Sequence, residues 1–86
     1  LPILEKNKVK IRADGFMSIR RKGFDYDFLI EVDLTHFDGF KYLKIKNPLP
    51  PIISISPYKR PYPKELEVYH IKKDFSNFKD FLSLLE

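Results

Sequence analysis

The stretch DFLIEVDLTHFDGFKYLKIK, residues 27–46, carries the strongest structural signal in the chain. It predicts two strands joined at Asp38-Gly39, because Asp-Gly between alternating apolar residues is the strongest short-range hairpin signal. Pairing outward from that turn gives two apolar pairs on one face and two acid–base pairs on the other: Leu34 with Leu43, Val32 with Ile45, Asp33 with Lys44, and Glu31 with Lys46. Apolar side chains meet apolar ones and acids meet bases, so register and facing agree.

A second Asp-Gly pair, Asp14-Gly15, predicts an earlier hairpin formed by residues 8–13 and 17–22. A two-residue turn would mix polar and apolar residues on each face. A three-residue loop, Asp14-Gly15-Phe16, instead pairs Ile11 with Ile19 and Ala13 with Met17. We therefore predict the three-residue loop, with Gly15 at positive φ.

The register of this first hairpin places basic residues together on its outer face. That face comprises Lys8, Lys10, Arg12, Ser18, Arg20 and Lys22. Arg20 then lies opposite Lys10, and Lys22 opposite Lys8, which is destabilising for like charges. Solvent, acids from a neighbouring strand or a bound polyanion must dilute this repulsion.

The rest of the chain predicts two strands and a helix. Residues 23–26 link the hairpins, and the proline-containing residues 47–51 form a polyproline-like linker. Ile52–Ser56 is a short strand, expected at a sheet edge. Residues 65–72 alternate, with Leu66, Val68 and His70 on one face. Residues 76–85 are predicted to be helical, with Ser76 or Asp74 as the N-cap. Together with the preceding Phe75, their apolar residues follow helical spacing: Phe75, Phe78, Phe81 or Leu82, and Leu85.

These elements predict one α+β domain, residues 1–86. We expect a twisted, mainly antiparallel sheet of about five or six strands, because the connections are too short for helical crossovers. A partly closed barrel is an alternative arrangement of the same strands. The C-terminal helix covers the apolar face of the sheet.

Composition favours a small intracellular protein. The 86 residues include 43% hydrophobic and 33% charged residues, which is globular composition. There is no cysteine, which favours a reducing compartment such as the cytoplasm, and no apolar run approaches the length of a membrane span. The sequence lacks Gln and Cys and is rich in Lys and Ile, a composition that is typical of thermophiles. An AT-rich genome is the alternative explanation of this composition.

The formal net charge of +4 is unevenly distributed. Residues 1–23 contain seven bases and two acids, and residues 48–73 contain five bases and two acids. The second region includes the loop PYKRPYP, residues 57–63, whose tyrosine rings suit base stacking. The predicted nucleic-acid-binding residues are Lys8, Lys10, Arg12, Arg20, Lys22, Tyr58, Lys59, Arg60 and Tyr62. The alternatives are a solvated basic face and a stiff connector.

Catalytic motifs are weak. Tyr69, His70 and Lys72 form the best set for a small nuclease, but a strand histidine is more often structural. The sequence gives no reason to expect a cofactor or a metal site. We expect a non-catalytic nucleic-acid-binding or accessory protein. The alternative is a protein–protein module or homodimer that docks through the Pro/Tyr-rich loop or the C-terminal helix.

Overall fold

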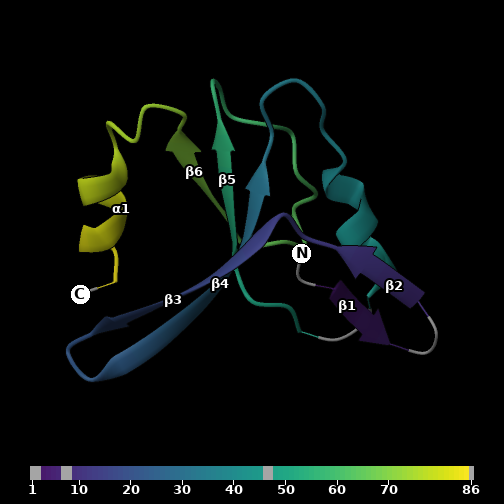
Figure 1. The fold of residues 1–86 in the computed structure, drawn as a ribbon, viewed down its shortest axis with the longest axis horizontal. Helices are drawn as coiled ribbons and strands as arrows, with labels where there is room; N and C mark the ends of the chain where they lie inside the picture. The colour runs from purple at the N-terminus through teal and green to yellow at the C-terminus, as the bar shows by residue number, and fades with distance from the viewer. Residues whose placement is uncertain (1–2, 7–8, 46–47, 86) are drawn as a thin grey trace.

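In the residues that the structure describes, the chain forms a four-stranded mixed sheet, a separate two-stranded sheet and two short helices (Figure 1). The computed structural model describes residues 3–6, 9–45 and 48–85. β1 (Ile3–Lys6) pairs with β2 (Val9–Arg12). The larger sheet has the order β3 (Gly15–Arg21), β4 (Phe24–Val32), β5 (Ile52–Ser56) and β6 (Val68–Lys72). The α+β class is confirmed, whereas the single sheet and the partly closed barrel were wrong.

The predicted first hairpin does not form, because β2 leads into β3 without reversing direction (Figure 1). Ala13 between them is fully buried, and the Asp14 backbone N–H donates to the Ile30 carbonyl oxygen at 3.0 Å. The Asp14 carboxylate accepts from the Val32 N–H at 2.8 Å, which extends the pairing beyond the end of β3. Gly15 pairs with Ile30 and has no positive φ, so the loop prediction was wrong.

The hairpin that does form joins β3 to β4 through Lys22-Gly23, which the sequence analysis did not predict as a turn. Both residues have positive φ, 52° and 83°, as a two-residue turn of type I′ requires. Arg20 now lies opposite Asp25 of β4, and Lys10 belongs to the other sheet. The predicted Lys10–Arg20 pairing was therefore wrong, and Arg20 meets an opposite charge instead of a like one. Lys8 lies outside the described residues.

The hairpin predicted at Asp38-Gly39 was also wrong. β4 ends at Val32, and Gly39–Lys44 is a 3₁₀ helix, η1. The pairs Leu34–Leu43, Val32–Ile45 and Asp33–Lys44 do not form, and Lys46 lies outside the described residues. A Cβ on Gly39 would come within 2.6 Å of the Tyr62 ring, so the glycine serves close packing here.

The sheet is mixed rather than mainly antiparallel, because β5 runs parallel to both β4 and β6. The predicted bounds of β5 are confirmed, but its predicted edge position was wrong. Parallel neighbours need a crossover connection, and both connections are long enough. Residues 33–51, which include η1, join β4 to β5, and residues 57–67, which contain no regular helix, join β5 to β6. β5 is consequently covered on both faces, with Ile52 and Ile53 about equally buried. β6 begins at Val68, later than residue 65.

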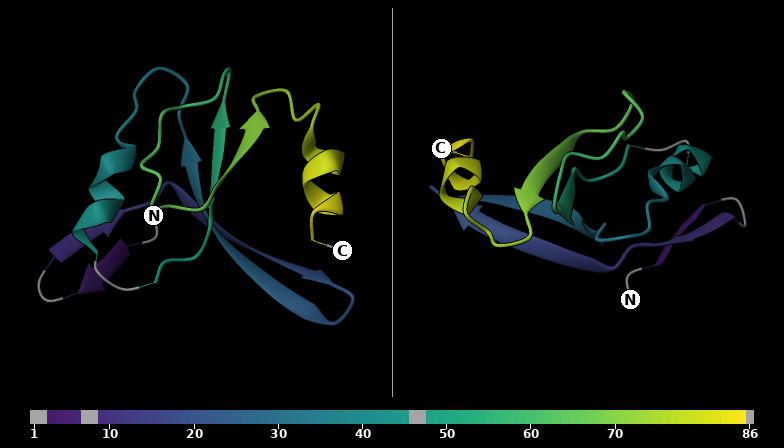
Figure 2. Two further views of the ribbon diagram at one scale, coloured as in Figure 1. Left: turned by 180° about the vertical axis from the view of Figure 1, so that it is seen from behind. Right: turned by 90° about the horizontal axis from the view of Figure 1, so that it is seen from above.

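Two hydrophobic clusters lie on opposite faces of the larger sheet. Ile11, Leu29, Tyr42 and Ile52 belong to the cluster that η1 and β2 cover. The other cluster is covered by α1 (Phe78–Ser83), and its buried members are Phe28, Ile53, Ile71, Phe81 and Leu85. Figure 2 shows α1 at one end of the molecule and η1, β1 and β2 at the other.

The C-terminal helix is confirmed, but it is shorter than predicted and differently capped. Its N-cap is Asn77 rather than Ser76 or Asp74. The Asn77 side chain bonds β6 instead of the helix: Oδ1 accepts from the Lys72 N–H at 2.9 Å, and Nδ2 donates to the His70 carbonyl oxygen at 2.8 Å. Asn77 therefore holds α1 against the edge strand. Phe75, expected on the apolar stripe, is 52% exposed.

Candidate functional site

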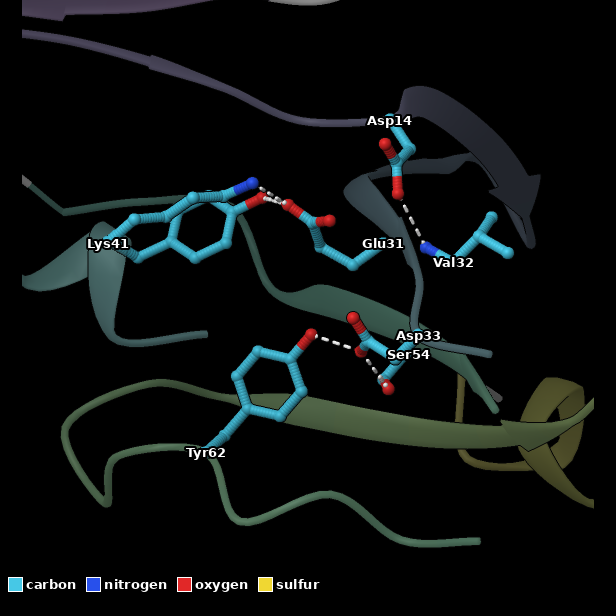
Figure 3. A network of polar contacts seen from close by, with 8 residues as sticks. Asp14, Glu31, Val32, Asp33, Lys41, Ser54 and Tyr62 are labelled. Carbon is cyan, nitrogen blue, oxygen red and sulfur yellow. Dashed lines mark hydrogen bonds and ion pairs between the residues drawn. The ribbon is translucent and has the colours of Figure 1, made fainter. Parts of the chain in front are cut away.

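A buried polar network lies on the face of the larger sheet that packs against η1 and the Pro-rich loop, residues 57–67 (Figure 3). Glu31 of β4 and Asp33, the residue just after β4, both point to this face and are only 6% and 3% exposed. On β5 the same face presents Ser54 and Ser56, both fully buried. Buried charges are retained only where hydrogen bonds and ion pairs offset their desolvation. Each carboxylate therefore needs a dedicated set of partners.

Glu31 binds η1. Its Oε1 lies 2.7 Å from Lys41 Nζ and also accepts the hydroxyl proton of Tyr42, a fully buried residue. Burial raises the pKa of Glu31, and the Lys41 and Tyr42 contacts oppose that rise. Burial, together with the Glu31 carboxylate, raises the pKa of Tyr42 above its ordinary value. The tyrosine therefore stays a hydrogen-bond donor, and the contact anchors η1 to the sheet.

Asp33 binds the Pro-rich loop. Its Oδ2 accepts from Ser54 Oγ at 2.7 Å and from Tyr62 Oη at 2.5 Å (Figure 3). Burial and the Asp33 carboxylate raise the pKa of Tyr62, so this hydroxyl also remains a donor. The Asp33 carbonyl oxygen accepts from Arg60 Nη2 at 2.8 Å and from Nε at 3.1 Å. The side chain and backbone of one residue thus hold two residues of the loop.

The outer part of the Pro-rich loop is held by further contacts. Ser56 Oγ donates to the Tyr58 carbonyl oxygen at 2.8 Å. The Arg60 guanidinium lies 4.4 Å from the centre of the Tyr58 ring, and its Nη1 donates to Tyr58 Oη at 2.9 Å. Tyr58 nevertheless remains 59% exposed. The loop therefore presents an aromatic ring and a stacked cation in a defined geometry.

Two cavities lined by described residues flank the Pro-rich loop, and the ionisable side chains that border them carry opposite charges. The cationic cavity, about 330 Å³, is bordered by Lys59, Arg60, Lys64 and His70. The acidic cavity, about 460 Å³, is bordered by Glu65 and Glu67 with apolar residues of η1 and β5. Among the described lining residues, no acid borders the first cavity and no base borders the second. The loop therefore separates positive from negative charge.

The structure divides the predicted basic site into separate groups. Lys10 and Arg12 lie on β2, and Lys22 lies in the β3–β4 turn at the opposite end of the molecule (Figure 1). Arg20 is engaged by Asp25, with Nε 2.8 Å from Oδ1, and this contact lowers the pKa of the Asp25 carboxyl. Lys59, Arg60 and Tyr62 border one cavity of the Pro-rich loop and Tyr58 stacks on Arg60, but the Tyr62 hydroxyl donates to Asp33. The expected single basic face on a first hairpin was wrong.

The residues considered for a nuclease are also separated. His70 faces the Pro-rich loop, and its Nε2 lies 3.1 Å from the Ser56 carbonyl oxygen. Tyr69 faces the opposite side of the sheet, where it packs against Phe28 and Phe81. Successive strand residues point to opposite faces, so these two cannot act on one substrate group. In the described part of the chain, no cluster of three or more His, Cys, Asp or Glu side chains could hold a metal ion.

Sequence reasoning missed the contributions of Glu31, Asp33, Ser54, Lys64 and His70 to this site. A signal was present: Glu31 and Asp33 are two residues apart in the chain, and so are Ser54 and Ser56. Two such polar stripes within apolar strands indicate adjacent strands that share a buried polar face. The signal was interpreted instead as exposed cross-strand pairing with lysines.

Comparisons with known proteins return no match, whether with family models, curated proteins or solved structures. Within the described residues, no helix combines the length and apolar character needed to cross a bilayer.

Proposed function

We propose that this chain is a non-catalytic nucleic-acid-binding protein whose contact surface is the Pro-rich loop rather than the first strands. The observation that carries the proposal is the gathering of Lys59, Arg60 and Lys64 around one cavity beside an exposed tyrosine ring. Lysine and arginine supply the phosphate contacts that dominate affinity for nucleic acids. An exposed ring supplies a stacking platform for a base of a single strand.

Preorganisation supports the same assignment. Asp33 and Ser56 hold the loop through part-buried hydrogen bonds, and Arg60 donates to the carbonyl oxygens of Asp33 and Leu34. A loop that is already ordered loses little conformational freedom when it binds. Lys59 and Lys64 are exposed, and in the described part of the chain neither has an ion-pair partner. Both are available to phosphates.

The test is binding of a labelled single strand over a salt series from about 50 to 200 mM. Removal of one phosphate contact should flatten the slope of log K against log salt by about 0.7 for single strands. The double variant Lys59→Ala/Lys64→Ala should therefore flatten it by about 1.4 and weaken binding at the lowest salt. The matched control Lys10→Ala/Arg12→Ala removes the same charge from β2, and its slope should change less.

Two outcomes would overturn the proposal. One is no detectable binding of any single strand at about 50 mM salt, where phosphate contacts are strongest. The other is an equal effect of the two double variants, because net charge alone would then explain the affinity. A labelled duplex run in parallel tests the preference for single strands, since a stacking tyrosine needs unpaired bases.

A second candidate is self-association through the C-terminal helix, and exposed apolar side chains there favour it. Leu84 is 67% exposed and Phe75 is 52% exposed, although they flank a helix whose other side is well packed. Sedimentation of the wild type and of Leu84→Glu over a concentration range tests it. A dimer that the substitution dissociates would support it, and a monomer at every concentration would exclude it.

A further inference from the structure

The cationic cavity has two kinds of wall. Its charged wall consists of Lys59, Arg60 and Lys64. Its apolar wall consists of Pro61, Pro63, Leu66 and Val68, and the Tyr62 ring also borders the cavity. A ligand that satisfies both walls is an organic anion with a flat, weakly polar body. Inorganic phosphate would use only the first wall, and an uncharged ring only the second.

The cavity is also lined by His70 and Ser54, whose side chains are held by hydrogen bonds within the protein. The Ser56 carbonyl oxygen can only accept, so His70 Nε2 carries a hydrogen and donates at 3.1 Å. Ser54 is 1% exposed and donates its hydroxyl proton to Asp33. Since Tyr62 also donates to Asp33, the buried carboxylate is hydrogen-bonded and does not face a ligand unshielded.

Size limits what the cavity accepts. At about 330 Å³ it lies at the small end of the range for ligand-binding cavities, about 300–1,000 Å³. One nucleotide unit fits this range, whereas a longer segment of strand must continue over the loop surface near Tyr58. The acidic cavity is larger but would repel the same ligand through Glu65 and Glu67.

We infer that the cationic cavity binds one nucleoside monophosphate unit, with its phosphate at Lys59, Arg60 and Lys64 and its base against Pro61, Leu66 and Val68. This inference rests on the proposed function, because it names the unit that the same loop recognises. The unit has two sources: a free nucleotide, or the phosphorylated end of a strand. Both present the same phosphate and base.

The experiment uses the histidine ring resonances in proton NMR. The chain has two histidines, and His36 is exposed and does not border the cavity, so it is an internal control. Titration with AMP should shift the His70 resonances saturably and leave those of His36 in place. Adenosine and inorganic phosphate, each lacking one half of the ligand, should shift His70 only at much higher concentration.

Variants test the charged wall. Lys64→Ala removes one charge-assisted contact to the phosphate and should therefore weaken AMP binding about tenfold or more. Lys10→Ala on β2 should leave AMP binding unchanged. Because Lys64 is exposed, its replacement should not unfold the chain, and a thermal unfolding midpoint close to that of the wild type would verify this.

The two sources are separated by competition with oligonucleotides. A strand with a 5′-phosphate that displaces AMP better than the same strand with a 5′-hydroxyl identifies the strand end as ligand. Displacement by neither strand identifies the free nucleotide, and equal displacement by both strands shows that an internal nucleotide unit is bound instead of the strand end. An unmoved His70 at saturating AMP overturns the inference, and salt-dependent binding of strands would still leave the proposed function intact. If neither AMP nor any single strand binds, both the inference and the proposed function are overturned.

Discussion

Among single residues, Asp33 is the one on which most contacts of the candidate site depend. Its carboxylate accepts two hydroxyl donors, and its carbonyl oxygen accepts Arg60. It sits one position beyond the end of β4, where its backbone N–H donates to the Ile55 carbonyl oxygen at 2.8 Å. One residue therefore joins two strands and the Pro-rich loop.

Asp33→Ala should destabilise the fold by about 2–4 kcal/mol, because it leaves the hydroxyls of Ser54 and Tyr62 without their acceptor and each unmet donor costs about 1–3 kcal/mol. Urea unfolding measures the change. Asp38→Ala is the matched control, since Asp38 is exposed and its side chain makes no capping hydrogen bond. Equal stability of the two variants would contradict the structural role of Asp33.

Glu31 gives a prediction about pH. Burial raises its folded pKa above the unfolded value of about 4.3. The folded state then binds more protons, so the contribution of Glu31 to stability is fully present below about pH 4.3 and is lost as pH rises through the folded pKa. The free energy of unfolding of the wild type minus that of Glu31→Gln should therefore fall as pH increases. A difference that grows with pH would mean that the contacts with Lys41 and Tyr42 lower the pKa of Glu31 by more than burial raises it.

Among the secondary-structure elements, η1 owes its position to the absence of a side chain at Gly39. The ideal Cβ position there is 2.6 Å from atoms of both the Phe37 and Tyr62 rings. Phe37 and Tyr62 themselves pack edge to face, with ring centres 4.8 Å apart. Gly39 thus permits a three-way contact between η1, the segment before it and the Pro-rich loop.

Gly39→Ala should cost about 1–3 kcal/mol, the usual range for overpacking, because rigid rings on both sides must move. Gly15→Ala is the matched control, since its Cβ would meet Ile30 at an ordinary 3.4 Å. Thermal unfolding of the two variants measures the difference. If Gly39→Ala proves as stable as Gly15→Ala, the close approach of Tyr62 to η1 is disproved.

For the molecule as a whole, the larger sheet separates two chemistries. One face joins the polar network to η1 and the Pro-rich loop, and the other packs aromatic and aliphatic side chains under α1 (Figure 2). Tyr62 belongs to the first side and Phe81 to the second. The two rings contact different sets of side chains, because the sheet lies between them.

Because the sheet separates the two sides, substitutions on opposite sides should have additive effects on the free energy of unfolding. The double variant Tyr62→Phe/Phe81→Leu should be destabilised by the sum of the two single effects to within about 0.5 kcal/mol. Tyr62→Phe combined with Asp33→Asn should deviate from the sum by about 0.5–3 kcal/mol, because these two residues share one hydrogen bond. Urea denaturation of all five variants provides both cycles. Strong coupling across the sheet would show that the two sides do not pack independently.

The amino-acid sequence alone was sufficient for the elements whose signals are local. The strand Ile52–Ser56, a strand within the predicted range 65–72 and a C-terminal helix each follow from a few neighbouring residues, and the structure confirms them, although the second strand begins only at Val68 and the helix is shorter than predicted. The α+β class follows from the same patterns. Of the predicted site residues, Tyr58, Lys59, Arg60 and Tyr62 lie together on the Pro-rich loop because they are neighbours in the chain.

Tertiary contacts decide instead which strands pair and which of the glycines lie in hairpin turns. Asp14-Gly15 and Asp38-Gly39 both match the hairpin signal, yet burial of Ala13 and of Tyr42 outweighs that local preference. Lys22-Gly23, a weaker signal, forms the turn because its register buries Phe28 and pairs Arg20 with Asp25. Such choices are made by contacts between distant residues, and the free energy of those contacts exceeds that of any single turn.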